Sequence, residues 1–445
     1  MNVWRILLLG ALGTLGGLAQ TSPPPAPNAE PPTATSQPAA AEETPGAEEP
    51  EADLWQRDRC MGDLGGVRSK LEDAGVEFNL SMTNVFQQNA HGGVQTANAH
   101  RVSGSYDLEL TLDFEALKLW KGGTLYALAE GSWDRGVSDR GYVGDLFGVN
   151  ADAAGAQEIQ LSELWYEHVF LDKKLRVRLG KLDLTTDFDT NAFANDETGQ
   201  FLNGALVNAA NIPFPDRGHG LQFIAMPWEW LYFGAGVADA EANAVETGFN
   251  TTYHGPDNFF SVYEFGLMPT FKTGWGELPG NYRFGLWYDP QPRAKFFNPL
   301  GGRRLTVPLK RDDVGFYTSF DQMIFREKPE TEGDQQGLGW FFRYAYAHGD
   351  VNEVEDFWSV GGQYQGLIPT RDDDVLAFGV AQGVLSEDVR LEGRDPHRET
   401  ALELYYKVQL LPWLTLTPDF QWILRPGGED GRDAFVAGVR LQMSF

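Results

Sequence analysis

The chain ends in the stretch DAFVAGVRLQMSF, residues 433–445, which alternates without a break between two kinds of side chain. One face carries the apolar set Phe435, Ala437, Val439, Leu441, Met443 and Phe445. The other face carries Val436, Gly438, Arg440, Gln442 and Ser444. A period of two residues predicts a β-strand whose faces meet different surroundings. The stretch is longer than the usual globular strand of ~5 to 6 residues and reaches the ~9 to 11 that a tilted strand needs to cross a bilayer.

An apolar terminal strand needs a hydrogen-bonding partner on both edges if it lies in lipid, because lipid cannot satisfy backbone N–H and C=O groups. Closure of the sheet into a barrel supplies both partners. The alternative is a half-buried edge strand of a soluble β-sandwich, which this stretch alone leaves open.

Composition narrows the class of protein. The 445 residues fit one large barrel as well as several ordinary domains, so length leaves the domain count open. Hydrophobic residues make up 42% with a mean hydropathy of −0.34, and no run after residue 20 approaches the ~18 apolar residues of a spanning helix. A helical membrane protein is thus excluded. The net charge of −28 would repel nucleic acid, and the single Cys60 provides neither a disulfide nor a cysteine-based zinc site.

The chain divides into four segments. Residues 1–19 combine a basic Arg5, a short apolar core and small residues near Ala19, which predicts a secretory signal peptide. Residues 20–52 are almost only Pro, Ala, Glu, Thr and Ser, a composition that predicts a flexible spacer. Residues 53–75 show a weak helical period and are expected to form a short periplasmic segment. Residues 76–445 are expected to form the barrel.

Sixteen candidate strands follow from Val76 onward, and two of them show the pattern most clearly. Residues 105–114 place Tyr106, Leu108, Leu110, Leu112 and Phe114 on one face, opposite Asp107, Glu109, Thr111 and Asp113. Residues 401–410 place Leu402, Leu404, Tyr406, Val408 and Leu410 opposite Glu403, Tyr405, Lys407 and Gln409. A soluble protein would bury the apolar face, whereas a membrane barrel would turn it to lipid.

The connections favour the membrane barrel. Links after even-numbered strands are mostly short, and several pair an apolar residue with proline: Met226-Pro227, Met268-Pro269, Ile368-Pro369 and Leu411-Pro412. Links after odd-numbered strands are longer and polar: 87–103, 135–156, 186–217, 241–258 and 291–312. Short periplasmic turns and long extracellular loops are typical of outer-membrane barrels, and an even strand count places both termini on the periplasmic side.

The alternation breaks at two places. In residues 157–170 the apolar phase moves from Ile159 and Leu161 to Leu164 and Tyr166, and in residues 174–184 it changes at Gly180. A β-bulge explains such a change, and glycine is a common site for one.

The same region carries a family resemblance. The segments LSELWYEHV (161–169), LGKLDLTTDFD (179–189) and NAFANDETGQFLNGALVN (191–208) resemble the carbohydrate-selective porins of the OprB family, as do GDLGGVR (62–68), residues 399–428 and the final strand. The resemblance implies a sixteen-stranded porin that passes monosaccharides, chiefly glucose, into the periplasm without catalysis or cofactor. The spacer and Cys60 depart from the family's usual start.

Candidate pore residues follow from the alternation, because side chains opposite the lipid face point into the lumen. They are Asp107, Glu109, Asp113, Glu130, Glu163, Trp165, Glu167, Arg176, Arg178, Arg343, Glu403, Tyr405, Lys407 and Arg440. Carboxylate and guanidinium groups offer hydrogen bonds to a neutral sugar, and the rings of Trp165 and Tyr405 are expected to stack on its apolar face. The alternative is that these charges only keep the channel wet.

A narrow zone is expected around Arg176 and Arg178, together with Asp107 and Glu109. Sixteen strands leave an aqueous channel, so loops and long side chains must provide any narrowing. Residues 186–217 follow directly and contain Phe193, Phe201 and Phe214, so we expect this loop to fold inward.

A catalytic or metal-dependent function has little support. Glu163 and Glu167 resemble a glycosidase pair, but four residues along a strand separate them by ~13 Å, beyond the ~5 to 9.5 Å that hydrolysis requires. The seven histidines show no metal-ligand spacing, and His91 and His100 are expected in a solvated loop.

The sequence thus predicts an outer-membrane porin for carbohydrate-selective diffusion, with small neutral sugars, outer-membrane lipid and, through the strand ending at Phe445, the barrel-assembly machinery as partners. The alternatives are a general diffusion porin without a sugar site and a secreted, soluble all-β sugar-binding protein.

Overall fold

The computed structural model describes residues 53–153, 157–243, 251–252, 256–296, 308–331, 334–390, 397–431 and 433–445. The expected signal peptide (1–19) and spacer (20–52) lie outside the described residues.

Antiparallel strands dominate the described residues. The strands of the main sheet are β1 Val76–His91, β2 His100–Asp113, β3 Gly123–Trp133, β4 Gln157–Phe170, β5 Leu175–Leu182, β6 Gly218–Trp228, β7 Leu231–Asp239, β8 Phe259–Leu267, β9 Thr270–Thr273, β10 Gly276–Asp289, β13 Asp313–Arg326, β14 Gly337–Ala347, β15 Val354–Gln365, β16 Val375–Leu385, β17 Arg398–Leu411, β18 Leu414–Leu424 and β19 Ala434–Ser444. A separate pair consists of β11 Arg293–Ala294 and β12 Leu309–Lys310. The helices are α1 Val67–Asp73, α2 Gly136–Asp139, η1 Leu184–Thr186, α3 Gly204–Val207, α4 Glu387–Arg390 and η2 Pro426–Gly428. None of these helices is both long and apolar enough to cross a membrane.

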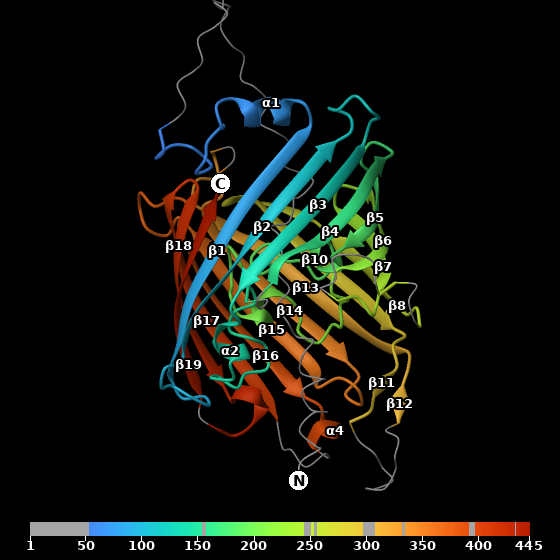
Figure 1. Cartoon of the computed structure of the whole chain (residues 1–445), viewed down its shortest axis with the longest axis vertical. Helices are drawn as coiled ribbons and strands as arrows, with labels where there is room; N and C mark the ends of the chain where they lie inside the picture. Colours follow the sequence, from blue (N-terminus) through green and yellow to red (C-terminus); the bar gives the residue numbers. More distant parts are fainter. Residues whose placement is uncertain are drawn as a thin grey trace, which may run out of the picture.

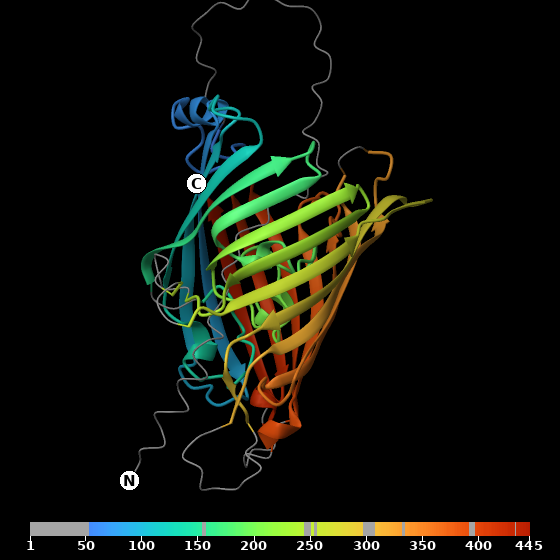
Figure 2. The same ribbon diagram turned by 90° about the vertical axis from the view of Figure 1, so that its right-hand side faces the viewer.

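The main sheet closes into a barrel (Figures 1 and 2). Each strand pairs with its neighbours in the chain, and the terminal strand β19 pairs with β1 from Ser81 opposite Ser444 to His91 opposite Phe435. β8 and β9 run one after the other along β10, separated at Pro269, so they occupy a single place in the barrel. The seventeen strands of this sheet therefore make the predicted sixteen-stranded antiparallel barrel.

The two faces of the wall follow the predicted alternation. On β2, Leu108 is exposed on the outside while Asp107 is buried on the inside. On β17, Leu404 is 43% exposed and its neighbour Glu403 only 1%. The outward apolar face is suited to lipid, and the inward face is polar.

Short turns and long loops also alternate along the chain as predicted, with two corrections. Gln87 and Ser103 remain in the strands, so the first long loop spans only residues 92–99, and His91 and His100 belong to the strands that flank it. The pair Met268-Pro269 does not end its strand, because pairing with β10 resumes at Thr270. Proline removes one N–H from the ladder, which interrupts a strand without requiring a turn.

Only one of the two expected bulges is present. In β4 the pairing with β3 shifts between Leu128 and Ala129, and Ser162 is the extra residue, as the change of phase predicts. In β5 the prediction of a bulge is wrong, because pairing with β6 continues in register from Leu175 to Leu182. Gly180 instead has a φ of +143°, and a Cβ there would lie 2.3 Å from the carbonyl oxygen of Leu164. Because Gly180 has no side chain, the backbones of β4 and β5 can approach each other.

The N-terminal part of the described chain lies at the short-turn rim. Helix α1 sits there close to the C-terminus (Figure 1), and the guanidinium of Arg68 donates to the carbonyl oxygen of Phe445 at 3.1 Å. The backbone N–H of Cys60 donates to the carbonyl oxygen of Ser444 at 2.8 Å. Both ends of the barrel sequence therefore meet on the side expected to be periplasmic.

Candidate pore constriction

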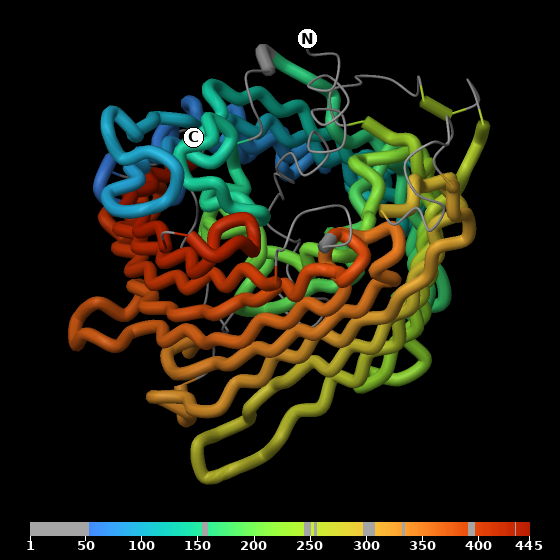
Figure 3. The backbone as a smooth tube through the Cα atoms, turned by 90° about the horizontal axis from the view of Figure 1, so that it is seen from below, coloured from blue at the N-terminus to red at the C-terminus, as the bar shows by residue number. Residues whose placement is uncertain are grey.

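A long loop folds into the barrel between β5 and β6. This inward loop, residues 183–217, carries η1 and α3, and each short helix is capped by a side chain: Asp183 accepts from the N–H of Thr185, and Asn203 from the N–H of Ala205. Phe201 of this loop is fully buried, with its ring edge-on to Phe341 and Tyr405 of the barrel wall. The expected inward fold of residues 186–217 is therefore observed (Figure 3).

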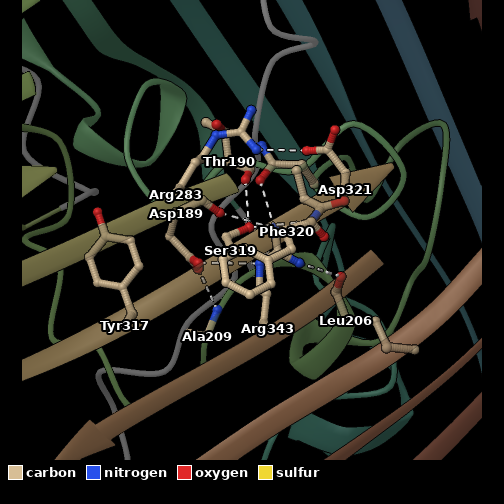
Figure 4. A network of polar contacts seen from close by, with 12 residues as sticks. Asp189, Thr190, Leu206, Ala209, Arg283, Tyr317, Ser319, Phe320, Asp321 and Arg343 are labelled. Carbon is tan, nitrogen blue, oxygen red and sulfur yellow. Dashed lines mark hydrogen bonds and ion pairs between the residues drawn. The ribbon is translucent and has the colours of Figure 1, made fainter. Parts of the chain in front are cut away.

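One anchor of the inward loop is the ion pair between Arg343 on β14 and Asp189 (Figure 4). The Nε atom of Arg343 lies 3.3 Å from Oδ1 of Asp189, and the same guanidinium donates to the Asp189 carbonyl oxygen and to the Asn195 side chain, both at 3.0 Å. The other carboxylate oxygen of Asp189 accepts the N–H of Ala209 at 2.7 Å. Ser319 on β13 donates to the carbonyl oxygen of Thr190 at 2.7 Å.

A second anchor lies on β17 and β19. The two carboxylate oxygens of Glu403 accept the N–H groups of Leu202 and Asn203 at 2.7 and 2.8 Å. Arg440 donates to the backbone oxygens of Glu197 and Gln200 at 2.7 and 2.9 Å. Arg343, Glu403 and Arg440 are thus lumen-facing as predicted, but the inward loop covers them: each is at most 1% exposed.

A second inward loop, residues 134–153, was not anticipated from the sequence. The carbonyl oxygen of Val149 accepts from the side chains of Gln87 and Gln421, each at 2.8 Å. The N–H of Ala151 donates to the carbonyl oxygen of Leu202 at 2.8 Å, so the two inward loops are joined. The available signal was the recurrence of valine in a Gly- and Asp-rich loop, because Val137, Val143 and Val149 are all fully buried.

An arginine cluster joins the wall to the start of the inward loop. Arg178 on β5 lies 3.0 Å from Glu167 on β4 and 3.0 Å from Asp187 of the loop. Arg176 lies 3.6 Å from Glu167 and also pairs with Asp187, which accepts a further hydrogen bond from Gln222 at 2.7 Å. Burial alone would raise the pKa of Asp187, but the two guanidinium groups outweigh it and lower the pKa to about 2.

The lumen aromatics differ from expectation. Tyr126 on β3 stacks on Trp165 with ring centroids 4.8 Å apart, and the guanidinium of Arg178 on β5 lies 4.0 Å from the Trp165 centroid. Because β3 and β5 flank β4 on opposite sides, both faces of the Trp165 ring are covered. Tyr405 is 1% exposed beneath Phe201. Neither ring presents an open face on which a sugar could stack.

The remaining candidate carboxylates have separate partners. Glu163 accepts from the indole N–H of Trp165 at 3.0 Å, whereas Glu167 is held by the arginine cluster. Glu130 forms an ion pair with Arg217 at 2.8 Å, at the end of the inward loop. Glu163 and Glu167 therefore do not act together as a facing pair.

The narrow zone expected from Arg176, Arg178, Asp107 and Glu109 does not form a single cluster of contacts. Asp107 and Glu109 lie on β2, three strands from Arg178. Glu109 is connected to Arg178 through Tyr126, whose hydroxyl donates to Glu109 at 3.0 Å, and through Trp165, which contacts both Tyr126 and Arg178. Asp113 is exposed at the rim and accepts the N–H groups of the following turn, because it is the last residue of β2. Lys407 is half-buried and interacts electrostatically with Asp196 of the inward loop. Asp187, Asp189 and Arg217 were not predicted from the sequence as site residues, although the first two fall within the LTTDFD motif, residues 184–189.

A closed barrel of sixteen strands with an apolar outer face, a polar interior and inward-folded loops defines an outer-membrane porin. Comparison with known proteins gives the family. A family profile described as "Carbohydrate-selective porin, OprB family" matches residues 97–445, and the chain belongs to this family.

Two relatives agree with this assignment. Porin B of Pseudomonas aeruginosa is 24% identical over 422 residues, covering 86% of this chain and 91% of that protein. The high-pH structure of Pseudomonas putida OprB superimposes with a TM-score of 0.77 at 22% identity, covering 89% of this chain and all of that one. The predicted family and fold are confirmed. The protein is a porin of the carbohydrate-selective class.

Proposed function

We propose that this porin admits small neutral sugars of the size of glucose by passive diffusion into the periplasm, and that it performs no catalysis. In this proposal the two inward loops set the width of the channel. The water-facing parts of the arginine cluster supply the selectivity.

The observation that supports the proposal most directly is the pairing of opposite charges beside the inward loop. The Arg176 side chain is 27% exposed and Glu167 is 13% exposed, with Nε and Oε2 3.6 Å apart. A neutral polyol can donate to the carboxylate and accept from the guanidinium at once. An ion of either sign meets one group that repels it.

The competing function is a general diffusion pore without a sugar site. One observation favours it: Arg178, Arg343 and Arg440 already donate hydrogen bonds to groups within the protein, and each is at most 2% exposed. Such residues stabilise the inward loops and need not touch a solute. The two functions therefore differ in whether the partly exposed Arg176 contacts the solute.

Liposome swelling separates the two functions. Vesicles carrying the wild-type porin are compared in glucose, a disaccharide and an uncharged amino acid solution, and the measurement is repeated with Arg176→Ala and Arg178→Ala. Lys328→Ala is the control, because Lys328 pairs with Asp372 in an exposed ion pair outside both inward loops. We expect wild type to favour glucose beyond its size, and Arg176→Ala to reduce that preference. If wild type and every variant admit the three solutes simply in order of their size, the protein is a general diffusion pore without a sugar site.

We further propose that lipid surrounds the apolar outer face and that the barrel-assembly machinery recognises the terminal strand. Support comes from β19, whose outward residues include Val439 at 38% exposed, and from the following Phe445, which donates its N–H to the carbonyl oxygen of Leu80 at 2.9 Å. The strand therefore forms the closing seam.

A further inference from the structure

A cavity of about 420 Å³ opens at the short-turn rim, away from the arginine cluster. Its wall combines three parts of the chain: residues of β1, β2 and β19, Thr198 of the inward loop, and Asp58 and Arg59 of residues 53–66, which we call the mouth segment. The volume falls within the ~300 to 1,000 Å³ of small-molecule sites. The cavity therefore has room for a small solute at the periplasmic end of the pore.

The mouth segment is held in place at this cavity. Besides the bond from Cys60 to Ser444, the indole N–H of Trp413 donates to the carbonyl oxygen of Leu54 at 2.9 Å. Arg59 pairs with Glu72 at 2.7 Å and its side chain stays 28% exposed at the cavity. The positive charge of Arg59 is thus fixed at the mouth by Glu72 on α1 and by Glu77 on β1, which lies 3.7 Å away.

The opposite wall contains a buried acceptor with spare capacity. Asp107 lines the cavity and is 8% exposed; its Oδ2 atom accepts from Ser81 at 3.2 Å, while its Oδ1 atom has no hydrogen-bond partner among the described residues. A buried acceptor left unpaired costs ~1 to 3 kcal/mol. Because Oδ1 is enclosed by protein, a hydroxyl group entering the cavity would bond to Oδ2, which accepts one hydrogen bond from Ser81 and can accept a second.

The other polar groups at the cavity suit a polyhydroxylated ligand. Glu109 is a further acceptor, and the amides of Asn79 and Gln442 provide both donors and acceptors. Asp58, Asp107 and Glu109 outnumber the single cation Arg59 among the described lining residues, so the cavity carries a net negative charge. Anionic solutes are disfavoured there.

We propose that the mouth segment completes a second polyol subsite at the periplasmic end of the pore, in which Asp107 accepts a sugar hydroxyl and Arg59 donates to the sugar oxygens. The subsite retards anionic sugars such as sugar acids relative to neutral ones. This inference rests on the proposed function and deepens it, because it adds an exit site to the selectivity of the constriction.

The test uses the full-length porin in planar bilayers and liposomes. Two quantities are measured: the glucose concentration that half-maximally reduces the ion current, and the ratio of gluconate to glucose permeation. Arg59→Ala is expected to raise the half-maximal concentration at least fivefold, and Asp107→Asn to raise the ratio at least threefold. Lys272→Ala is the matched control, because Lys272 is an exposed cation on β9 near the same rim, paired with Glu277 and outside the cavity.

The outcomes distinguish the two proposals. If wild type favours glucose over the amino acid but both variants match it, the subsite is overturned and the proposed function stands. If wild type shows no sugar preference and no reduction of current by glucose, both are overturned. Should Asp107→Asn fail to give a heat-modifiable barrel, Glu109→Gln and Arg59→Ala carry the test with the same two measurements.

Discussion

Arg343 on β14 and Asp189 of the inward loop form an ion pair in which neither side chain is exposed to water, although 154 residues separate them in the chain. Desolvating two charges is costly, so removal of one partner leaves a buried charge that destabilises the protein by ~3 to 5 kcal/mol. The ion pair therefore holds the inward loop against the barrel wall and contributes to the stability of both.

Replacing Arg343 should widen the pore. In Arg343→Met the charge of Asp189 loses its partner, so we expect a less firmly held inward loop, higher single-channel conductance and a lower unfolding temperature on unboiled gels. The double variant with Asp189→Asn should recover part of the stability, because no unpaired charge remains. Lys328→Met, at an exposed ion pair outside both inward loops, serves as the control. Unchanged conductance in Arg343→Met would show that the pair does not hold the loop.

Deleting Phe445 should impair assembly. Its N–H donates to Leu80 on β1 and its carbonyl oxygen accepts from Arg68 on α1, so the deletion removes contacts of the chain end with both elements. We expect less folded porin in the outer-membrane fraction and more unfolded chain in the periplasm. Phe445→Tyr keeps the ring and should assemble normally. Equal amounts of heat-modifiable barrel from the deletion and from wild type would contradict the prediction.

Asp152 should make the stability of the second inward loop depend on pH. Burial raises its pKa from the ordinary 3.8 to about 6, despite the Ser105 hydroxyl and Arg440, which lower it. The folded protein therefore binds this proton more tightly than the unfolded chain, so stability decreases as pH rises from about 4 to about 6 and is level above that. The shift corresponds to at most about 3 kcal/mol.

The measurement for Asp152 is the unfolding temperature of wild type and Asp152→Asn between pH 4 and pH 7. The amide oxygen of asparagine can still accept from Ser105 but carries no charge. We expect the variant to gain stability relative to wild type as pH rises through this window. Parallel curves for the two proteins would mean that Asp152 does not titrate there.

Gly180 should tolerate no side chain. Its φ of +143°, and the 2.3 Å that would separate an added Cβ from the Leu164 carbonyl oxygen, together predict that Gly180→Ala lowers stability by ~1 to 3 kcal/mol or more. Gly274→Ala is the control, since a Cβ at Gly274 would meet no atom within 4 Å. Similar unfolding temperatures for the two variants would indicate that β4 and β5 move apart at little cost.

The sequence alone determined the class of structure and the direction of most side chains in the wall. Alternation is a local property with a period of two, so Leu404 and Glu403 could be assigned to opposite faces without knowledge of any partner strand. Link lengths and the pattern of the terminal strand are also local properties. They indicated a closed barrel without knowledge of which strands pair.

Only the tertiary structure decided how the lumen is filled. The partners of Arg343, Glu403 and Val149 lie more than 60 residues away in the chain, and no period in the sequence relates them. The ring of Trp165 is covered by Tyr126 and Arg178 from the two neighbouring strands, and Asp107 lines a cavity to which the mouth segment contributes Asp58 and Arg59. Contacts across a barrel depend on which loops enter it, and that choice is made by packing and charge pairing among distant residues.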